Sequence, residues 1–462
     1  MVVTAICLWA ALFAGHLAQL WAAQIKPSSH GDLRSLSLKD AVETALRHNP
    51  MISASRYLLE SSRQRYIQAR SGLYPHLKIS ERFTRTTNPM WAFGTKLNQE
   101  SITRQDFDPR LLNDPDAIDN FQTAISLTYP LYDRGRIRKG IEQARLQREA
   151  ASLSLETVRQ EVAVSTVEAY LNVLLAKEEL EVLAKSLETA RAHHRMIQAR
   201  YRSGLVVKSD VLRSQVHVAQ LEQDLQQARA GLSVAFSALW ATLGKEHGGE
   251  VRLTTSFDRA PRSLPPLQEW LKKAFDRRPD LERAKKELEI AGKELEKAKA
   301  EYYPALYLSG AYEINTEDFD ESANNYTIGA VLELDLFSGF RTRARVKEAK
   351  AGVESAKARV EGLKLKIGVE VRRSYHRAES ALAQTRVALS AIGQAEEALR
   401  IVRNRYESGL FHLVQLLDAE TALQRARLNY IRALHQFRVA EARLALASGV
   451  VFEYVSDMGR SK

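Results

Sequence analysis

The stretch YRSGLVVKSDVL, residues Tyr201–Leu212, decides the fold, because a close copy of its beginning, YESGL, recurs at Tyr406–Leu410. Both copies lie between long runs rich in Ala, Leu, Glu, Arg and Lys, which are good helix formers. Glycine adopts the left-handed backbone that ends many helices and lets the chain reverse. Each copy is therefore predicted to be the turn of a helical hairpin.

The spacing of the two turns persists far beyond them. Tyr406 lies 406 − 201 = 205 residues after Tyr201. The same spacing matches Leu131 with Leu336, Tyr170 with Tyr375, and Gly244 with Gly449. Upstream, Pro279 matches Pro50 at 279 − 50 = 229 residues, so the first half carries 229 − 205 = 24 extra residues between Pro75 and Pro130. A repeat of this length predicts a duplicated fold.

Each half is predicted to contain a short helix, a second helix, a β-hairpin and a long helical hairpin. The first repeat spans residues 24–245, with its β-hairpin at about 77–131 and its helical hairpin at about 134–243. A linker, 246–266, precedes the second repeat, 267–449, whose β-hairpin covers about 306–336 and whose helical hairpin covers about 340–447. Residues 450–462 form a C-terminal tail.

The strand predictions depend on alternation. In 121–129 and in 326–336, apolar residues occupy one face and mostly small or polar residues the other. About 10 such residues are typical of a strand in a transmembrane β-barrel. Four strands cannot close a membrane barrel, and open sheet edges are not tolerated in lipid. The strands therefore belong either to a soluble sheet or to a barrel that several chains build together.

The region between Pro75 and Pro130 that holds the 24 extra residues contains TTNPMWAFGTKLNQ (86–99) and DPRLLNDPDAID (108–119). Pro, Asn, Asp and Gly are the residues of turns and loops. This insertion is predicted to be a long loop at the tip of the first β-hairpin.

The N-terminus and the composition indicate an exported chain. Residues 1–23 contain no Asp, Glu, Lys or Arg and end in small residues, as a secretory signal peptide does, and the one cysteine, Cys7, lies within them. No later run of about 18 apolar residues predicts a transmembrane helix. The net charge of +11 does not indicate nucleic acid in an exported chain without a recognition module.

In their order and duplication, these features resemble the TolC family of bacterial outer-membrane channels. The resemblance is carried by LKDAVETALRHNP (38–50), LYDRG (131–135), LFSG (336–339) and the two Tyr-x-Ser-Gly-Leu turns. It implies a mixed α+β membrane protein and a homotrimer. In that trimer, 3 × 4 = 12 strands form one β-barrel, continuous with a periplasmic α-helical barrel.

The function that the resemblance implies is a passive exit duct in the cell outer membrane, part of a tripartite efflux or type I secretion system. Its partners would be a periplasmic adaptor, an inner-membrane pump and outer-membrane lipid. The alternative is a periplasmic coiled-coil adaptor, which also has long helical hairpins but should show only one, flanked by β-rich domains. We find no catalytic motif and no cofactor motif, so energy for transport would come from a partner.

The resemblance also assigns roles near the two turns. The tips that would contact the adaptor are Gly204, Leu205 and Val206 in the first half, and Gly409, Leu410 and Phe411 in the second. Gln415 and Asp418 occupy the positions that ring and constrict the tunnel, and Asp210 and Tyr406 match residues that link the coils. Phe411 stands where the family has the basic partner of that link.

A basic collar lies directly after the second strand of each half: Arg134, Arg136 and Arg138 in the first, and Arg341, Arg343 and Arg345 in the second. At the inner surface of the outer membrane, anionic headgroups would attract these side chains by about 1 kcal/mol each. The alternative is an ordinary solvated start of a helix. His193 and His194 are predicted to be exposed helix residues, because no further ligands accompany them.

Overall fold

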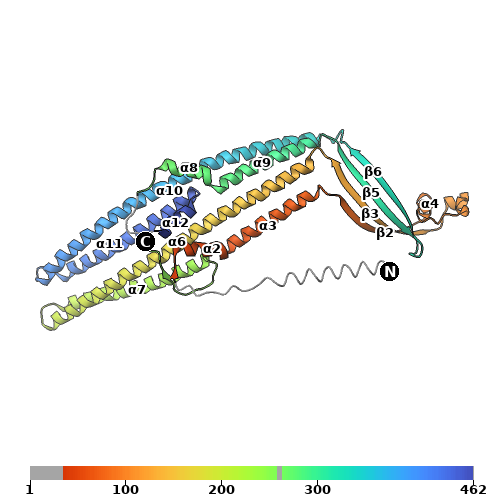
Figure 1. Cartoon of the computed structure of the whole chain (residues 1–462). Helices are drawn as coiled ribbons and strands as arrows, with labels where there is room; N and C mark the ends of the chain where they lie inside the picture. Colours follow the sequence, from red (N-terminus) through yellow and green to blue (C-terminus); the bar gives the residue numbers. More distant parts are fainter. Residues whose placement is uncertain (1–34, 258–262, 461–462) are drawn as a thin grey trace.

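The computed structural model describes residues 35–257 and 263–460. The predicted signal peptide, residues 1–23 with Cys7, lies outside the described residues. The molecule is elongated, with a β-sheet at one end and the turns of two helical hairpins at the other (Figure 1).

The predicted duplication is confirmed element by element. The first repeat contains α2 (Leu38–His48), α3 (Pro50–Ser71), β2 (His76–Thr86), β3 (Ile118–Tyr132), α6 (Arg136–Arg202) and α7 (Lys208–Thr242). The second contains α8 (Leu267–Arg277), α9 (Pro279–Ala300), β5 (Ala305–Thr316), β6 (Ala323–Glu333), α10 (Arg341–Glu407) and α11 (Leu413–Ala447). Both long helices have 67 residues, which corresponds to about 100 Å at 1.5 Å per residue.

The two β-hairpins form one antiparallel sheet in the order β2-β3-β5-β6. The register places Ile79 opposite Ile125, Ile125 opposite Tyr312, and Tyr312 opposite Tyr326. One apolar face therefore runs across all four strands, and the other face is polar. The outer edges of β2 and β6 have no strand partner in the single chain, within the residues that the structure describes.

The last strand is shorter than the alternation predicts. We expected it to extend to Leu336, but β6 ends at Glu333. Its neighbour β5 begins at Ala305, opposite Glu333, directly after Pro304. Residues beyond Glu333 therefore lack a partner strand, and alternation alone does not reveal where the partner begins.

The prediction of a long loop in the insertion is wrong. Residues 89–113 form α4 (Pro89–Asn98), a 3-10 turn η1 (Arg104–Phe107) and α5 (Pro109–Asn113). The side chains of Asn88 and Asp108 accept hydrogen bonds from the first backbone N–H groups of α4 and α5. Asn-Pro and Asp-Pro are turn signals, but the same pairs start helices, with the polar residue as the cap and proline in the first turn.

Each repeat is closed by a junction where the return helix meets the short opening helix. Gly244 (φ 73°) and Gly449 (φ 72°) lie just beyond the ends of α7 and α11. A Cβ at Gly244 would lie 2.4 Å from the carbonyl oxygen of His48, and one at Gly449 would lie 3.1 Å from that of Arg277. Both glycines therefore satisfy two constraints, a left-handed backbone and a close backbone approach.

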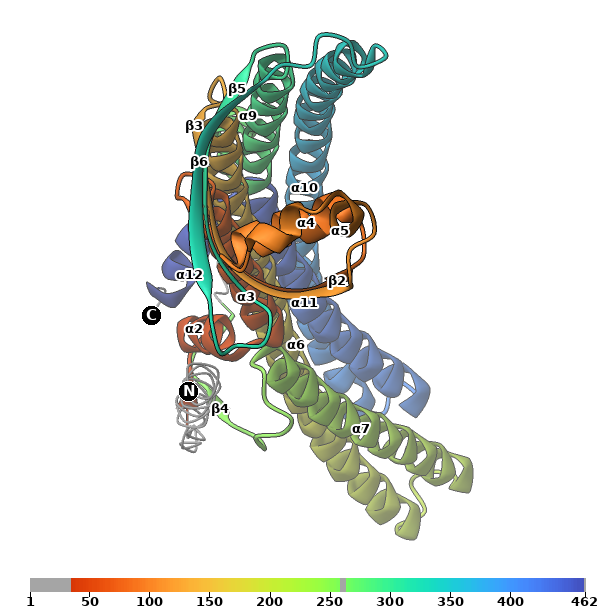
Figure 2. The ribbon, with the colours of Figure 1, turned by 90° about the vertical axis from the view of Figure 1, so that its right-hand side faces the viewer.

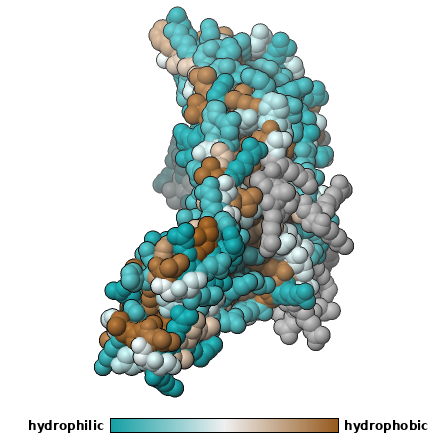
Figure 3. All heavy atoms as spheres, turned by 90° about the vertical axis from the view of Figure 1, so that its left-hand side faces the viewer, coloured by the Kyte–Doolittle hydropathy of each residue, from teal (hydrophilic) through white to brown (hydrophobic). Residues whose placement is uncertain are grey.

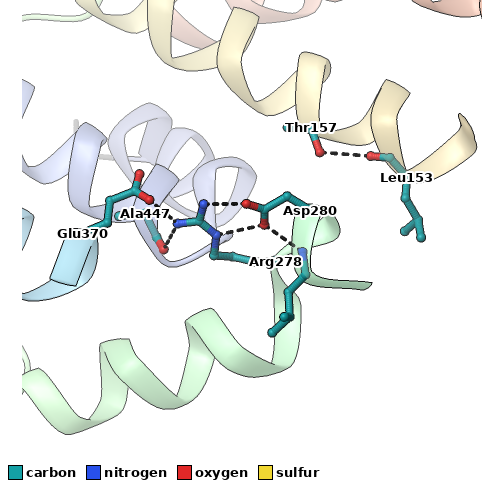
Figure 4. A network of polar contacts seen from close by, with 7 residues as sticks. Leu153, Thr157, Arg278, Asp280, Glu370 and Ala447 are labelled. Atoms are coloured by element: carbon teal, nitrogen blue, oxygen red, sulfur yellow. Dashed lines mark hydrogen bonds and ion pairs between the residues drawn. The ribbon is translucent and has the colours of Figure 1, made fainter. Parts of the chain in front are cut away.

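Different side chains tie the two junctions. Asn49 Nδ2 donates to the carbonyl of Thr242 at 2.8 Å, while Arg278 Nη1 donates to the equivalent carbonyl of Ala447 at 3.0 Å. Arg278 also binds Asp280 and Glu370 (Figure 4). Burial alone would raise the pKa of the Asp280 carboxyl, but the bonds from Arg278 outweigh it and hold that pKa below its ordinary value.

The main core lies at the level of these junctions, where α2, α6, α7, α11 and α12 (Val451–Arg460) pack together. Tyr170 Oη donates to the carbonyl of Leu36 at 3.0 Å and accepts from the N–H of Thr255 at 3.1 Å. These bonds hold β1 (Ser35–Leu36) and β4 (Arg252–Leu253), a parallel pair, against α6. Within the described ranges, no helix is long and apolar enough to cross a membrane.

The close approach at Gly244 can be tested against a glycine that lacks it. Gly249 has a similar φ of 68°, but a Cβ there would meet nothing within 4 Å. Gly249→Ala is expected to cost about 1 kcal/mol from the left-handed backbone alone, and Gly244→Ala clearly more, because His48 must also move. Thermal unfolding of the purified variants measures the difference. Equal shifts in Tm would show that the junction tolerates a Cβ.

Candidate functional site

Both helical tips end their long helix in the same way. Gly204 (φ 71°) and Gly409 (φ 75°) adopt the left-handed conformation. Leu205 N–H donates to the carbonyl of Arg200 and Leu410 N–H to that of Arg405, both at 2.9 Å. The N–H of each glycine also donates to the carbonyl of the residue three positions before it. These two hydrogen bonds together make the Schellman motif. The predicted turns are confirmed in their geometry.

The tips expose matching apolar side chains. Leu205 and Leu410 are each 73% exposed, whereas Val206 and Phe411 are half-buried against a cluster that joins the two hairpins. Figure 3, which views the molecule from the tip end, shows apolar patches on a mostly hydrophilic helical surface. Two equivalent leucines are thus exposed at the ends of the two hairpins.

Tyr406 lies at the interface between the two hairpins. The guanidinium of Arg200, on α6, is 5.3 Å from the centre of its ring. Burial raises the pKa of the Tyr406 phenol; Arg200 opposes this rise, and the Asp210 carboxylate adds to it. Asp210 is therefore near, but Tyr406 Oη has no hydrogen-bond partner among the residues that the structure describes. The expected Asp210–Tyr406 bond is absent from the single chain, and stacking with Arg200 takes its place.

Phe411 also has an arginine on its ring. The guanidinium of Arg405 lies 5.2 Å from the centre of that ring. The family resemblance places Phe411 where other members have a basic residue, and the structure brings a basic group to that position from the preceding helix. Arginine–aromatic stacks of this kind contribute about 0.5–1 kcal/mol at exposed sites.

The two predicted ring positions lie in the first turns of α11. Gln415 Oε1 accepts a hydrogen bond from the N–H of His412 at 2.9 Å, so Gln415 caps its own helix. Asp418, one turn further on, has an exposed side chain. The cap gives Gln415 a structural role, and Asp418 is the exposed carboxylate of the two positions.

A row of polar contacts joins α6 to α11, and sequence reasoning missed it. Arg443 pairs with Glu168 (2.6 Å), His435 bonds Asn172 (2.8 Å), Arg432 pairs with Glu179 (2.7 Å), and His193 pairs with Glu420 (2.5 Å). We call these four contacts the inter-hairpin row. Because α6 and α11 are antiparallel and far apart in the sequence, each of the four pairs has a different sequence separation. No fixed spacing in the sequence therefore reveals these contacts.

The member of the row nearest the tips is also the most buried contact in it. The side chains of His193 and Glu420 are 17% and 9% exposed. The prediction of exposed histidines is therefore wrong here: His193 faces α11, and His194 bonds Ser214 at 2.7 Å. Over the described part of the chain, no group of three or more His, Cys, Asp and Glu is placed to hold a metal ion.

The basic collar lies at the junction of the helices with the sheet. Arg341 pairs with Asp335 (2.9 Å) and Arg345 with Glu301 (2.6 Å). Arg136 Nη2 donates to Tyr307 Oη (3.0 Å), and Arg134 stacks on Tyr303 (4.7 Å). Arg138 and Arg343 are exposed. Several collar arginines are thus already bound within the chain, so the collar is less positive than its sequence suggests.

A known protein family matches the chain in two segments, one in each structural repeat. The model of the outer membrane efflux protein family matches residues 41–245 and again 270–450. The chain belongs to this family. The match removes the alternative of a periplasmic adaptor. As a family member, the chain is an exit duct for efflux or secretion in the outer membrane, with its helical part in the periplasm.

Relatives of the outer membrane efflux protein family match over nearly the whole chain. The alkaline protease secretion protein AprF of Pseudomonas aeruginosa is 26% identical over 434 residues, which cover 91% of this chain and 86% of AprF. Protein CyaE of Bordetella pertussis is 25% identical over 440 residues, covering 93% and 86%. The crystal structure of the outer membrane protein VceC of Vibrio cholerae has the same fold, with a TM-score of 0.72, 21% identity, and coverage of 89% and 96%.

The inter-hairpin row predicts that one buried pair holds the tips together. Glu420→Gln removes the charge that faces His193, whereas Glu396→Gln breaks an ion pair with Arg427 that lies within the second hairpin and is 36–50% exposed. Exposed pairs contribute about 0–1 kcal/mol, and breaking a buried pair costs more. We expect Glu420→Gln to raise single-channel conductance in a planar bilayer and Glu396→Gln to leave it unchanged. The reverse pattern would contradict this role for the row.

Proposed function

We propose that three copies of this chain form one channel, in which each contributes four strands to a β-barrel and two helical hairpins to a periplasmic tunnel. The observation that carries the proposal is the sheet itself: it has an apolar face across all four strands and two outer edges, β2 and β6, that the described residues leave unpaired. Unpaired edges are not tolerated in lipid. Joining β2 of one copy to β6 of the next removes them, and three copies is the number that the family resemblance implies.

The tips are proposed to be the docking point for a periplasmic adaptor, through which an inner-membrane pump delivers its substrate. The exposure of Leu205 and Leu410 supports this, because both project from the end of a hairpin and remain largely uncovered by the described part of the chain. Three chains would present six such leucines around one opening. A passive duct of this kind obtains its energy from the pump.

The periplasmic end is proposed to close around Asp418. Three-fold symmetry would bring three of these exposed carboxylates around one axis, where their negative charges attract cations. Asp210 and the stacked pair Arg200–Tyr406 would hold the second hairpin against the first. The collar, through Arg138 and Arg343 in particular, is proposed to meet the anionic headgroups of the inner leaflet.

The trimer is tested at the strand edges. Ser80 on β2 and Thr327 on β6 both lie on the polar face and on opposite edges of the sheet. With Cys7 replaced by Ser, the double variant Ser80→Cys/Thr327→Cys should give covalent dimers and trimers with a short bis-maleimide, while Ser80→Cys alone should not. A detergent-purified protein that is monomeric, or that conducts no ions in a planar bilayer, would refute the proposed channel.

The gate is tested by removing its carboxylates. Asp418→Ala should raise single-channel conductance and reduce the preference for cations, because the negative ring is lost. The Asp210–Tyr406 bond, absent from the single chain, is proposed to form in the closed trimer, and Asp210→Ala should therefore raise conductance. Planar-bilayer recordings measure both, and the gate assignment fails if neither variant changes conductance.

A further inference from the structure

The insertion in the first β-hairpin lies against one particular face of the sheet. Gln99 Nε2 donates to the carbonyl of Asp119 (2.8 Å) and to Asn120 Oδ1 (3.0 Å), and Asn120 Nδ2 donates to Asn315 Oδ1 (3.0 Å). Helix α4 contacts β3 and β6. Asn120, Asn315 and Ala323 are 9%, 0% and 4% exposed, although they lie near strand ends far from the long helices. The insertion therefore covers this end of the sheet.

The covered face is the polar and concave one. In the register, Asn315 lies opposite Gln122 on β3 and opposite Ala323 on β6. Asn120 is two residues before Gln122 and therefore lies on the same face. This face is the one opposite the apolar residues Ile125 and Tyr326. Figure 2, which views the sheet end, shows the strands curving around α4 and α5. In a closed barrel the concave face of each sheet is the inner face. The insertion therefore projects toward the interior and away from lipid.

The insertion has internal bonds that keep its shape. Lys96 Nζ lies 2.6 Å from Asp106 Oδ1, and the N–H and hydroxyl of Thr103 donate to the other oxygen of Asp106 at 2.6 and 2.7 Å. The bonds from Lys96 and Thr103 lower the pKa of the Asp106 carboxyl to about 2. The pair therefore stays ionised at neutral and mildly acidic pH. The rings of Phe93 and Phe107 meet edge to face at 5.7 Å.

This compact insertion exposes an apolar stripe. Met90 and Leu97, seven residues apart on one side of α4, are 82% and 49% exposed, and Trp91 beside them is 71% exposed. Phe107 and Leu111 add further exposed apolar surface from η1 and α5. Contiguous exposed apolar groups on an ordered element mark a contact surface.

We propose that residues 88–117 form a lid at the external mouth of the channel, and that the stripe of Met90, Trp91 and Leu97 packs against the same stripe of the other two copies. This inference rests on the proposed trimer. It assigns the stripe one partner, a second copy of this chain. The channel would then be narrowed at both ends by different devices, carboxylates at the tips and apolar side chains at the mouth.

The dimensions favour this partner. A barrel of 12 strands spaced about 4.8 Å apart and tilted by about 40° has a diameter of about 24 Å. An α-helix with its side chains is about 10 Å wide. Three such helices in contact around an axis need a circle of about 22 Å. The diameter of about 24 Å joins opposite strand backbones, so three helices fit side by side only beyond the strand ends, where Figure 1 shows α4, and there each copy of α4 meets the other two.

Lipid is the other apolar partner that a tryptophan could meet, and the geometry disfavours it. The apolar face of the sheet, with Ile79, Ile125 and Tyr326, is the face that would contact lipid, and α4 lies behind the opposite face. The other β-hairpin connects β5 to β6 through a short turn after Thr316 and has no comparable element. Each chain thus supplies one lid, and a trimer supplies three.

The contact between lids is tested by disulfide formation at Trp91. In a Cys7→Ser background, Trp91→Cys should form disulfide-linked dimers on mild oxidation of the purified trimer. Tyr326→Cys, at a position that is 75% exposed on the apolar face, should not. Trp91→Cys chains that remain monomeric on denaturing gels, while the native protein is a conducting trimer, would overturn the lid.

The effect on the channel is tested by two changes of different severity. Replacing residues 88–117 by a short Gly-Ser turn should increase single-channel conductance severalfold, and Met90→Asp/Trp91→Asp should increase it as well, because like charges on the axis repel. Unchanged conductance in a trimer of either variant would contradict the proposal. A wild-type protein that forms no trimer would instead refute the proposed channel, so the two failures are distinguishable.

Discussion

The whole architecture depends on two close backbone approaches, those of Gly244 to His48 and of Gly449 to Arg277. At each of them a long hairpin returns to the helix that opened its repeat. The approach fixes where the return helix ends, and therefore where the hairpin starts its course toward the tip. Since the two junctions are equivalent, the two hairpins have the same length, and their turns reach the same level. The largest core cluster lies at this level, so the hairpins project from a firm base.

Away from that base the packing changes in kind. Near the junctions, buried apolar side chains and the Arg278 network hold the helices. Between α6 and α11, the row of ion pairs and hydrogen bonds, many of them exposed, leads from this base toward the tips, where a second apolar cluster around Ile197 and Tyr406 joins the hairpins. Exposed pairs are weak, whereas buried apolar contacts are strong. The firmest contacts between the two hairpins therefore lie at the base and in the apolar cluster at the tips, and the stretch between them is held by weaker polar contacts.

The sequence was sufficient for the parts of the fold that obey local rules. Both Ser-Gly turns lie where expected, because helix caps and glycines act within a few residues. Prediction from the sequence failed where a contact with a residue far along the chain decides the local structure or burial. The end of β6 depends on where β5 begins, and His193 is buried only because Glu420 faces it. The prediction of a loop in the insertion failed for a different reason. Asn-Pro and Asp-Pro signal both a turn and a helix start, and only the residues after the proline decide between them.

The insertion also breaks the symmetry that duplication created. It leaves β2 and returns to the adjacent β3, where the second β-hairpin has only a short turn, and the strands that α4 contacts are β3 and β6. The end of the channel that faces the outside of the cell can therefore change in sequence and shape independently of the end that must fit an adaptor. A cell could alter what its surface presents to the environment while keeping the same export machinery inside.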